Sequence, residues 1–436
     1  MTWRAAALLA VGALTLPGWP APFVGVAVMV GVVLLLVGID LTLAAPLRAL
    51  TAERAGERAV RLGGTATVTL YLRNSSSRPL RARVRDAWVP SAGARPEVPP
   101  NRVVRAAPGE VLALPSHLTP TRRGDRPAVA LTVRSFGPLG LAFRQLGGRP
   151  DTPQWTVRVL PRFDSRRHLP ERLSRLRVID GTQVGRGRGP GTEFDALREY
   201  VSGDDVRSID WRASARRAEV LVRTWRPERD RRLICVLDTG RTSAVRVGDE
   251  PRLDASIEAA LLLSALAARA GDRVDVLAAD AVSRASVAGV ERPGQWSRLA
   301  HALAPLQPTL VETDFRLIAG ELLRRHRPRS LVVLLTALEP GALGEGLLPV
   351  LPRLAARHRV LVAAAQDPVL ARLTATPPRR AEDAYTAAAA WRTLTERDRL
   401  TAALTRHHVT VVDAPAPHLA PALADAYLTL KSKAQL

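Results

Sequence analysis

The sequence has little that could crosslink it or bind a soft metal. Cys235 is the single cysteine among 436 residues, so no internal disulfide can form, and it lies in an apolar run typical of a buried strand. This composition fits a reducing compartment for most of the chain. Residues 169–300 contain no histidine, which argues against a histidine-based metal or catalytic cluster in that region.

Lysine is almost absent. Only Lys431 and Lys433 are lysine among 63 basic residues, and the formal net charge is +22. Such a charge suits nucleic acid or an anionic membrane surface, but it equally suits a chain that uses arginine on every surface. No basic run is interleaved with aromatic residues at the spacing of a nucleic-acid-binding module. Nucleic acid is therefore not a favoured partner.

Charged residues are also missing near the N-terminus, where none occurs from Ala5 to Ile39 and PGWPAP at 17–22 breaks the run. The second apolar segment is long enough for about 30 Å of hydrocarbon. No small-x-small cleavage motif follows the first apolar segment, which favours a helical hairpin over a cleaved signal peptide. Both arrangements place the main body of the chain on the same side of the membrane. Basic residues follow the apolar segments: Arg48, Arg54, Arg58 and Arg61. We expect a transmembrane hairpin anchor at 1–47 in the plasma membrane, with the C-terminal bulk cytoplasmic.

The remaining length suits two folded domains, with 47% hydrophobic and 24% charged residues overall. Residues 58–162 contain alternating runs such as TATVTLYLRN and PAVALTVRSF between turn-forming clusters. This pattern predicts a β-sandwich that serves as a spacer or interaction module. Residues 230–434 alternate apolar strand runs with helical stretches, which predicts a parallel sheet covered on both faces, a doubly wound α/β domain.

The segment 163–229 is assigned as a linker, and it carries GTEFDALREYVSGDDVRSIDWRASAR. Thr192 and Asp195 could begin a helix that runs to about Tyr200, with Arg198 placed to pair with Asp195. Asp210 and Trp211 are expected to be fixed by packing. Three arginines are near enough to neutralise the acids: Arg207, Arg212 and Arg216.

This motif resembles the bacterial family known as domain of unknown function 58. The resemblance is carried by Glu193, Phe194, Arg198, Tyr200, Gly203, Asp204, Arg207, Asp210, Trp211 and Arg216. It extends in outline over the whole chain, and it implies a von Willebrand factor A-like domain of Rossmann type at the C-terminal end. It also implies a membrane-linked adaptor, often encoded beside MoxR-type AAA+ ATPases and membrane-bound transglutaminase-like proteins.

Domains of the von Willebrand A type can bind Mg²⁺ through a D-x-S-x-S loop, a distant threonine and a second aspartate, all hard oxygen ligands. Three residues match this set: Asp238, Thr242 and Thr313. Gly240 offers no side-chain oxygen, a later strand ends at Thr336 where a carboxylate is expected, and Glu339 comes too late. We therefore expect a degenerate metal site and no cofactor, with Mg²⁺ as the candidate ion.

The leading interpretation is non-enzymatic. A membrane-anchored adaptor would present its A-like domain and the acidic and arginine-rich motif to a protein partner, expected to be a MoxR-type AAA+ ATPase. Carboxylates shared with bidentate arginines suit a structural latch between the two domains better than general acids. The first alternative is a metal-dependent hydrolase that uses the acids of residues 193–210. The second is arginine-mediated binding of nucleic acid or anionic lipid.

Overall fold

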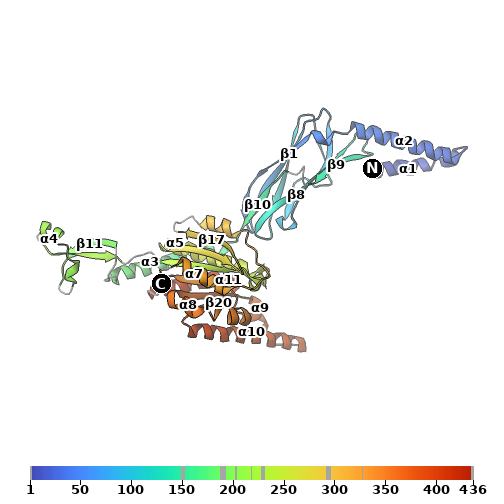
Figure 1. Cartoon of the computed structure of the whole chain (residues 1–436). Coiled ribbons are helices and arrows are strands. Elements are labelled where there is room, and N and C mark those ends of the chain that lie inside the picture. Colours follow the sequence, from blue (N-terminus) through green and yellow to red (C-terminus); the bar gives the residue numbers. More distant parts are fainter. Residues whose placement is uncertain are drawn as a thin grey trace. The chain divides into compact units, whose positions relative to one another are not determined.

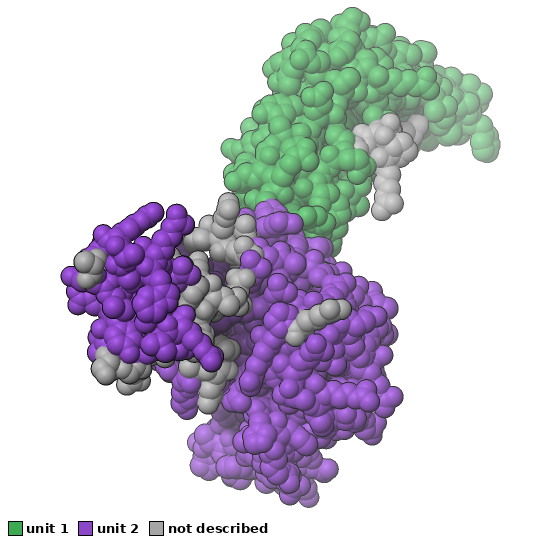
Figure 2. All heavy atoms as spheres, turned by 60° about the vertical axis from the view of Figure 1, so that its left-hand side comes forward, with its two compact units in different colours: residues 1–162 green, residues 163–436 purple. Residues whose placement is uncertain are grey.

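The structure is a computed structural model that describes residues 2–148, 153–186, 193–201, 204–217, 219–226, 231–290, 296–326 and 328–433. It divides into two compact units, Met1–Arg162 and Phe163–Leu436 (Figures 1 and 2). Each unit has its own hydrophobic core, and each is described by itself.

Unit 1 begins with apolar helices. α1 (Trp3–Ala13) and α2 (Pro22–Leu43) contact each other, with the short helix η1 (Leu16–Gly18) between them. Prolines occupy the first turns of η1 and α2, where a missing N–H donor is tolerated. With the turn that follows it, α2 forms a 28-residue stretch, Pro22–Ala49. Within the described residues, this is the one helix long and apolar enough to cross a membrane by length and composition.

Two β-sheets form the rest of unit 1. One has the order β1-β3-β7-β5, and the other has the order β2-β10-β8-β4-β6 with β9 paired to β8. Leu70 and Leu72 from the first sheet pack with Leu80 and Ala82 from the second, because alternate side chains of each strand point inward. The strands are β1 (Leu50–Gly56), β2 (Ala59–Arg61), β3 (Ala66–Asn74), β4 (Leu80–Trp88), β5 (Ala94–Pro96), β6 (Val103–Ala106), β7 (Val111–Leu118), β8 (Gly124–Phe136), β9 (Phe143–Gly148) and β10 (Thr156–Leu160). They begin at Leu50, before the predicted domain start at residue 58.

Asp40 ties α2 to the loop 137–142 between β8 and β9. Its side chain is fully buried. Its Oδ1 and Oδ2 atoms accept backbone hydrogen bonds from the N–H groups of Leu139 (2.8 Å), Gly140 (3.3 Å), Leu141 (2.7 Å) and Ala142 (3.0 Å). A Cβ at Gly137 would lie 2.2 Å from Asp40, so only glycine allows this close approach. A buried carboxylate therefore positions the end of the apolar helix against the β-sheets.

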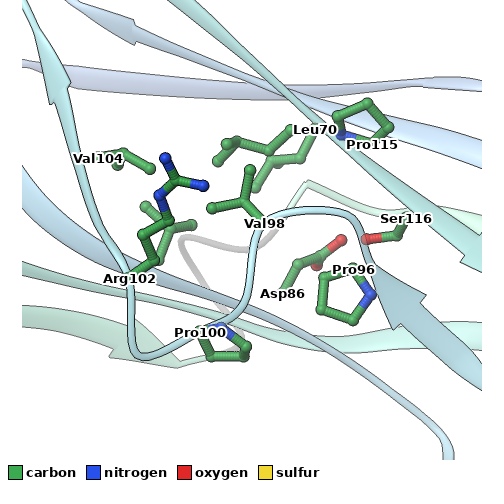
Figure 3. Close-up of a pocket in the computed structure, with 11 residues that line it drawn as sticks. Leu70, Asp86, Pro96, Val98, Pro100, Arg102, Val104, Pro115 and Ser116 are labelled. Carbon is green, nitrogen blue, oxygen red and sulfur yellow. The ribbon is translucent and has the colours of Figure 1, made fainter.

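A small cavity of unit 1 is lined by residues of both sheets (Figure 3). Its volume is about 20 Å³, and its lining includes Leu70, Asp86, Val98, Arg102 and Val104. That volume holds about one water molecule. The cavity is therefore a packing defect and too small for an organic ligand.

Unit 2 is built on a six-stranded sheet of order β17-β16-β13-β18-β19-β20. The strands are β13 (Arg232–Asp238), β16 (Arg273–Ala279), β17 (Ser283–Val290), β18 (Leu331–Leu335), β19 (Arg359–Gln366) and β20 (Thr410–Pro415). Neighbours pair in parallel except at one edge, where β17 pairs antiparallel with β16. The five strands predicted from the sequence pair in parallel, and the structure adds the antiparallel edge strand β17, which follows β16 through a short turn and needs no crossover helix.

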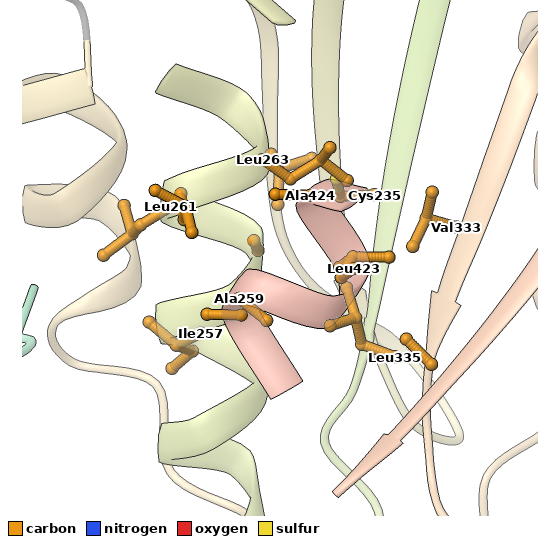
Figure 4. Packing of buried hydrophobic residues seen from close by; sticks show 14 of the residues in the cluster. Cys235, Ile257, Ala259, Leu261, Leu263, Val333, Leu335, Leu423 and Ala424 are labelled. Atoms are coloured by element: carbon orange, nitrogen blue, oxygen red, sulfur yellow. The ribbon is translucent and has the colours of Figure 1, made fainter. Parts of the chain in front are cut away.

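Helices cover both faces of this sheet. Cys235 and Leu237 of β13 face α5 and α11, and Figure 4 shows the packing on this side of the sheet. Ile234 and Val236 point to the other face, where α7 and α8 lie. The helices are α5 (Arg252–Arg269), α6 (Trp296–Leu303), α7 (Phe315–Arg325), α8 (Leu351–Arg357), α9 (Pro368–Ala375), α10 (Ala381–Arg406) and α11 (Ala416–Ser432). Burial on both faces explains why the strands read as continuous apolar runs.

One further helix, α3 (Leu169–Arg186), packs on this core although its residues lie in the predicted linker 163–229. Leu176 is buried in the same cluster as α5 and α11. Arg172 and Arg175 bind the two carboxylate oxygens of Asp425 in α11, at 2.7 Å each. The α/β unit therefore begins before the motif, and the motif is an insertion between α3 and β13. The predicted latch between the two domains does not match this chain order.

His358 lies between α8 and β19 and is 1% exposed. Neither ring nitrogen has a hydrogen-bond partner among the described residues. Burial lowers the pKa of His358, and the nearby His326 and Arg357 lower it further. Burial likewise lowers the pKa of His326. The folded state therefore holds His358 in its neutral form.

We expect unit 2 to lose stability as the pH falls below about 6.5, the ordinary pKa of histidine. The unfolded chain binds the proton more readily, so the free energy of unfolding falls by up to about 1.4 kcal/mol per pH unit for one histidine. His358→Leu should reduce this slope. It should preserve the stability at about pH 8, because His358 is neutral at that pH in both the folded and the unfolded state. Urea unfolding followed by circular dichroism measures it. The exposed His418→Gln is the control, and an unchanged slope in His358→Leu would contradict the prediction.

Candidate functional site

Polar side chains gather where three neighbouring strands of unit 2 end. Asp238 ends β13, Asp280 follows β16 and Thr336 follows β18. These strands are adjacent in the sheet and parallel, so their carboxyl ends meet at one edge. Ligands of open α/β sheets bind at this edge.

The protein itself engages both carboxylate oxygens of Asp238. Oδ1 accepts hydrogen bonds from Gly240 N (2.8 Å) and Thr313 Oγ1 (2.5 Å). Oδ2 accepts hydrogen bonds from Thr242 Oγ1 (3.3 Å) and Thr336 Oγ1 (2.5 Å). Asp238 is 2% exposed. The structure thus brings together Asp238, Thr242 and Thr313, the three residues named from the sequence, and adds Thr336.

Asp280 is the centre of a second set of hydrogen bonds, beside the set around Asp238. Its Oδ2 accepts hydrogen bonds from Thr239 Oγ1 (2.9 Å), Thr309 Oγ1 (2.9 Å) and Arg284 Nε (2.8 Å). Burial opposes its charge, but the hydrogen bonds from Arg284, Thr309, Val282 and Thr239 outweigh burial and lower the pKa of Asp280 to about 2. Asp280 is therefore ionised at neutral pH and acts as an acceptor that positions these loops.

The surroundings of Asp238 do not fit Mg²⁺. A Cβ at Gly240 would lie 2.1 Å from Thr313 Oγ1, so the glycine makes room for that hydroxyl. Glu339 is bound by Arg252 (Nη1 to Oε1, 2.8 Å), which also donates to the backbone oxygen of Thr242 (2.6 Å). Both oxygens of Asp238 already accept hydrogen bonds from the protein, and Thr336 stands where the second carboxylate of an Mg²⁺ site is expected. The described residues contain no group of three or more His, Cys, Asp or Glu side chains placed to hold a metal.

Adding Mg²⁺ to about 5 mM is expected to change the Tm of unit 2 by less than about 1 °C, because a site with poor ligands binds too weakly to stabilise the fold. Differential scanning fluorimetry of the detergent-solubilised chain, with sodium chloride matched for ionic strength, measures this. A rise of several degrees that EDTA reverses and Asp238→Asn abolishes would contradict the poor fit.

The motif forms a separate small structure within unit 2. β11 (Glu193–Glu199) pairs antiparallel with β12 (Leu221–Arg226), and η5 (Val206–Ser208) and α4 (Trp211–Arg217) lie between them. The helix predicted from Thr192 or Asp195 to Tyr200 is therefore wrong. Asp195 and Glu199 are four residues apart, a spacing that a strand allows as well as a helix. Here the backbone groups of β11 are satisfied by pairing with β12. This pairing is the reason that the segment forms a strand and not a helix.

The acids of this motif are held by arginines and backbone N–H groups. Arg198 Nη2 donates to Asp204 Oδ1 (2.5 Å), and Val201 N donates to Asp204 Oδ2 (2.9 Å). Arg223 Nε donates to Asp210 Oδ2 (2.9 Å). Asp210 Oδ1 accepts hydrogen bonds from the backbone of Arg212 (3.1 Å) and Ala213 (3.0 Å) at the start of α4. The Ala213 N–H, followed by Arg223, lowers the pKa of Asp210.

These contacts revise the predicted partners. Arg198 pairs with Asp204, and Arg223, which the sequence reading missed, holds Asp210. The side chain of Asp195, the predicted partner of Arg198, lies outside the described residues. Arg207 lies in η5, where its backbone N–H donates to Asp205 Oδ1 (3.0 Å), and Arg216 is exposed on α4. The remaining motif residues are placed as follows: Glu193 and Phe194 lie in β11 with side chains outside the described residues, Tyr200 follows β11, and Gly203 lies outside the described residues.

Apolar side chains of the motif are exposed. Trp211 is 68% exposed, so the prediction that packing fixes it is wrong. It begins α4, and Asp210, the residue before it, accepts hydrogen bonds from backbone N–H groups of the first turn. Val201 and Val206 are 61% and 62% exposed. We call Val201, Val206 and Trp211 the motif patch.

The sequence carried signals for some of the missed residues. Asp280 ends the apolar run RVDVLAAD just as Asp238 ends RLICVLD, so their shared edge could be predicted. Thr336 follows a third such run. Arg223 had no comparable signal, because its contact with Asp210 depends on the register of β11 and β12.

Residues 196–410 match a family described as a protein of unknown function, DUF58. A protein of Mycobacterium bovis, described as uncharacterized, is 29% identical over 194 residues, which is 44% of this chain and 60% of the relative. A Mycobacterium tuberculosis protein, also described as uncharacterized, shows the same values. The chain thus spans 60% of the length of these curated relatives.

Similar solved structures cover about a quarter of the chain. A structure of native alpha-2-macroglobulin from Escherichia coli is 24% identical, covers 27% of this chain and 17% of its own, and has a TM-score of 0.21. A FixG-related protein from Vibrio parahaemolyticus is 12% identical, covers 26% of this chain and 96% of its own, and has a TM-score of 0.18.

Proposed function

We propose that this chain is a membrane-anchored adaptor that binds a protein partner through its α/β unit and the inserted hairpin. Its α/β unit would be a von Willebrand A-like domain with a degenerate metal loop, and the N-terminal helices would form a transmembrane hairpin. Because arginines follow the apolar segments, the bulk of the chain would lie in the cytoplasm. The partner we propose is a MoxR-type AAA+ ATPase.

The observation that carries this proposal is the motif patch. Exposed aromatic and β-branched side chains beside charged groups are typical of binding surfaces, and tryptophan is enriched among residues that dominate binding energy. Arg198 with Asp204, and Arg223 with Asp210, fix the backbone on both sides of the patch. A surface held in shape before binding loses less conformational entropy on association.

The same contacts count against the hydrolase alternative. A general acid needs a pKa raised towards neutrality, whereas hydrogen bonds lower the pKa of Asp210. Asp204 accepts from a guanidinium and a backbone N–H, which suits a structural carboxylate. No described contact in the motif supplies a base, a nucleophile and a water-binding position together. We therefore assign Asp204 and Asp210 to shaping the surface.

Trp211→Ala is expected to weaken binding of the purified MoxR-type ATPase from the same genome at least tenfold, because a central exposed tryptophan contributes about 2 kcal/mol or more to such interfaces. Biolayer interferometry with the detergent-solubilised full chain measures the affinity. Trp391→Ala is the matched control, since Trp391 is also exposed, at 57%, on α10. Equal affinity of the wild type and Trp211→Ala, or no binding of the ATPase at all, would overturn the proposal.

A further inference from the structure

Five arginines share the outer face of one sheet in unit 1. In the strand pairing, Arg81 of β4 lies opposite Arg105 of β6, and Arg83 of β4 lies opposite Arg134 of β8. Arg85 lies on the same face as Arg81 and Arg83, because alternate residues of a strand share a face. Their even-numbered neighbours Leu80 and Ala82 are buried in the core. We call Arg81, Arg83, Arg85, Arg105 and Arg134 the arginine face.

Within the described strands around it, the arginine face carries no acidic side chain to balance it. The strands β4, β6, β8 and β9 contain two acids, Asp86 and Asp125. Asp86 points to the opposite face, where it pairs with Arg54 (2.5 Å), and Asp125 lies at the far end of β8, bound to Arg158 (2.8 Å). Like charges directly opposite each other across strands are destabilising. The sheet therefore maintains a repulsion that an anionic ligand would relieve.

Aromatic and amide side chains hold two of these arginines in place. The guanidinium of Arg83 lies 5.5 Å from the ring centre of Phe136, and that of Arg134 lies 5.1 Å from the ring centre of Phe143. Arg134 Nε also donates to Gln145 Oε1 (2.8 Å). Contacts through the ring faces leave guanidinium N–H groups available for bidentate contacts with phosphate oxygens.

The arginine face begins where the apolar helix ends. Phe136 and Phe143 flank the loop 137–142 whose backbone binds Asp40 in the last turn of α2 (Figure 1). Arg81 Nη1 donates to the Pro138 oxygen of this loop (2.8 Å). Next to the face, Arg78 donates to the Thr42 and Ala44 oxygens at the end of α2. A helix that crosses a membrane would place these guanidinium groups at the level of the lipid headgroups.

We propose that the arginine face binds the phosphate groups of anionic phospholipids in the leaflet where α2 ends. This inference rests on the membrane anchoring contained in the proposed function, but not on the protein partner. Charge complementarity favours an anion, and continuity with the apolar helix favours a lipid over nucleic acid. Guanidinium groups bind phosphate through paired N–H donors, and each basic side chain near an anionic surface adds to the attraction.

The test compares lipid binding by the detergent-solubilised full chain in native mass spectrometry. Phosphatidylglycerol is titrated against phosphatidylcholine into the wild type, into Arg83→Gln with Arg134→Gln, and into Arg316→Gln with Arg324→Gln. The last pair removes the same charge from exposed positions on α7. We expect the wild type to prefer phosphatidylglycerol, and each arginine lost from the face to weaken that lipid about fivefold. The α7 control should retain the wild-type preference.

Two results would overturn the lipid assignment. One is an equal preference for phosphatidylglycerol in all three proteins, with the thermal unfolding of the face variant confirming that it is folded. The other is displacement of the lipid by a DNA oligonucleotide that depends on the same two arginines. Carbonate extraction of membranes from expressing cells tests anchoring separately. Extraction of the protein together with an intact lipid preference would overturn the anchoring and leave the lipid-binding face standing.

Discussion

Asp40→Ala is expected to lower the free energy of unfolding of unit 1 by about 3–5 kcal/mol, the range found when one partner of a buried charged contact is removed. The substitution removes the acceptor of backbone N–H groups from residues 139–142, which lie at 2.7 to 3.3 Å from the carboxylate. Hydrogen bonds to charged groups are stronger than neutral ones, and unpaired buried donors carry their full desolvation cost. Hydrogen exchange of the 137–143 amides in detergent measures the loss directly.

Two variants calibrate this result. Asp40→Asn keeps one oxygen but presents an amide N–H₂ to backbone donors, so its effect should be smaller than that of alanine and still large. Asp125→Ala removes the ion pair with Arg158, whose side chains are about two-fifths exposed, and should cost about 0–1 kcal/mol. If the loop amides stay as protected in Asp40→Ala as in the wild type, Asp40 does not position the loop.

Asp238→Ala is expected to destabilise unit 2 by a similar amount, about 3–5 kcal/mol, because the hydroxyls and the backbone N–H that converge on the carboxylate lose their acceptor in a closed environment. Thr313, Thr336 and Gly240 all donate to Asp238 from different segments of the chain. Loss of the acceptor therefore loosens three loops at the same edge of the sheet. Urea unfolding followed by circular dichroism gives the free energy.

The conservative companion is Thr336→Val, which keeps the shape and removes one hydrogen bond. Its expected cost is about 1–2 kcal/mol, since one acceptor of Asp238 then lacks one donor. If Asp238→Ala lowers the free energy of unfolding more than Thr336→Val does, the carboxylate is the centre of these hydrogen bonds. Equal effects would mean that the threonine packs independently of Asp238, and a negligible effect of Asp238→Ala would mean that the loops are held by other contacts.

The strands and helices after residue 230 could be predicted because their signals are local. A strand buried on both faces has to be apolar throughout, and β13, β18 and β19 are. The edge strand β17, SRASVAGV, is half exposed and lacks such an apolar run, so no strand is predicted there from the sequence. Its existence depends on the backbone edge that β16 offers.

The motif shows what a local reading cannot decide. The residues of β11 carry charges at spacings that suit a helix, and only pairing with β12, more than twenty residues later, selects the strand. The site at Asp238 could be predicted from the sequence in part. The loop residues Asp238 and Thr242 could be named from their order in the sequence. The close fit of Thr313 Oγ1 against Gly240, where a Cβ would lie only 2.1 Å away, could not. Asp40 and its loop, about a hundred residues apart, gave no sequence signal at all.

The placement of α3 has a consequence for how this chain can vary. Its contacts with α5 and α11 mean that the α/β core is in place on both sides of the inserted hairpin. Among the described residues between α3 and β13, none belongs to a strand of the six-stranded sheet. The hairpin is therefore interchangeable in principle: its length and surface can diverge without altering the order of the sheet. Partner choice and fold stability are then separate traits, open to change one at a time.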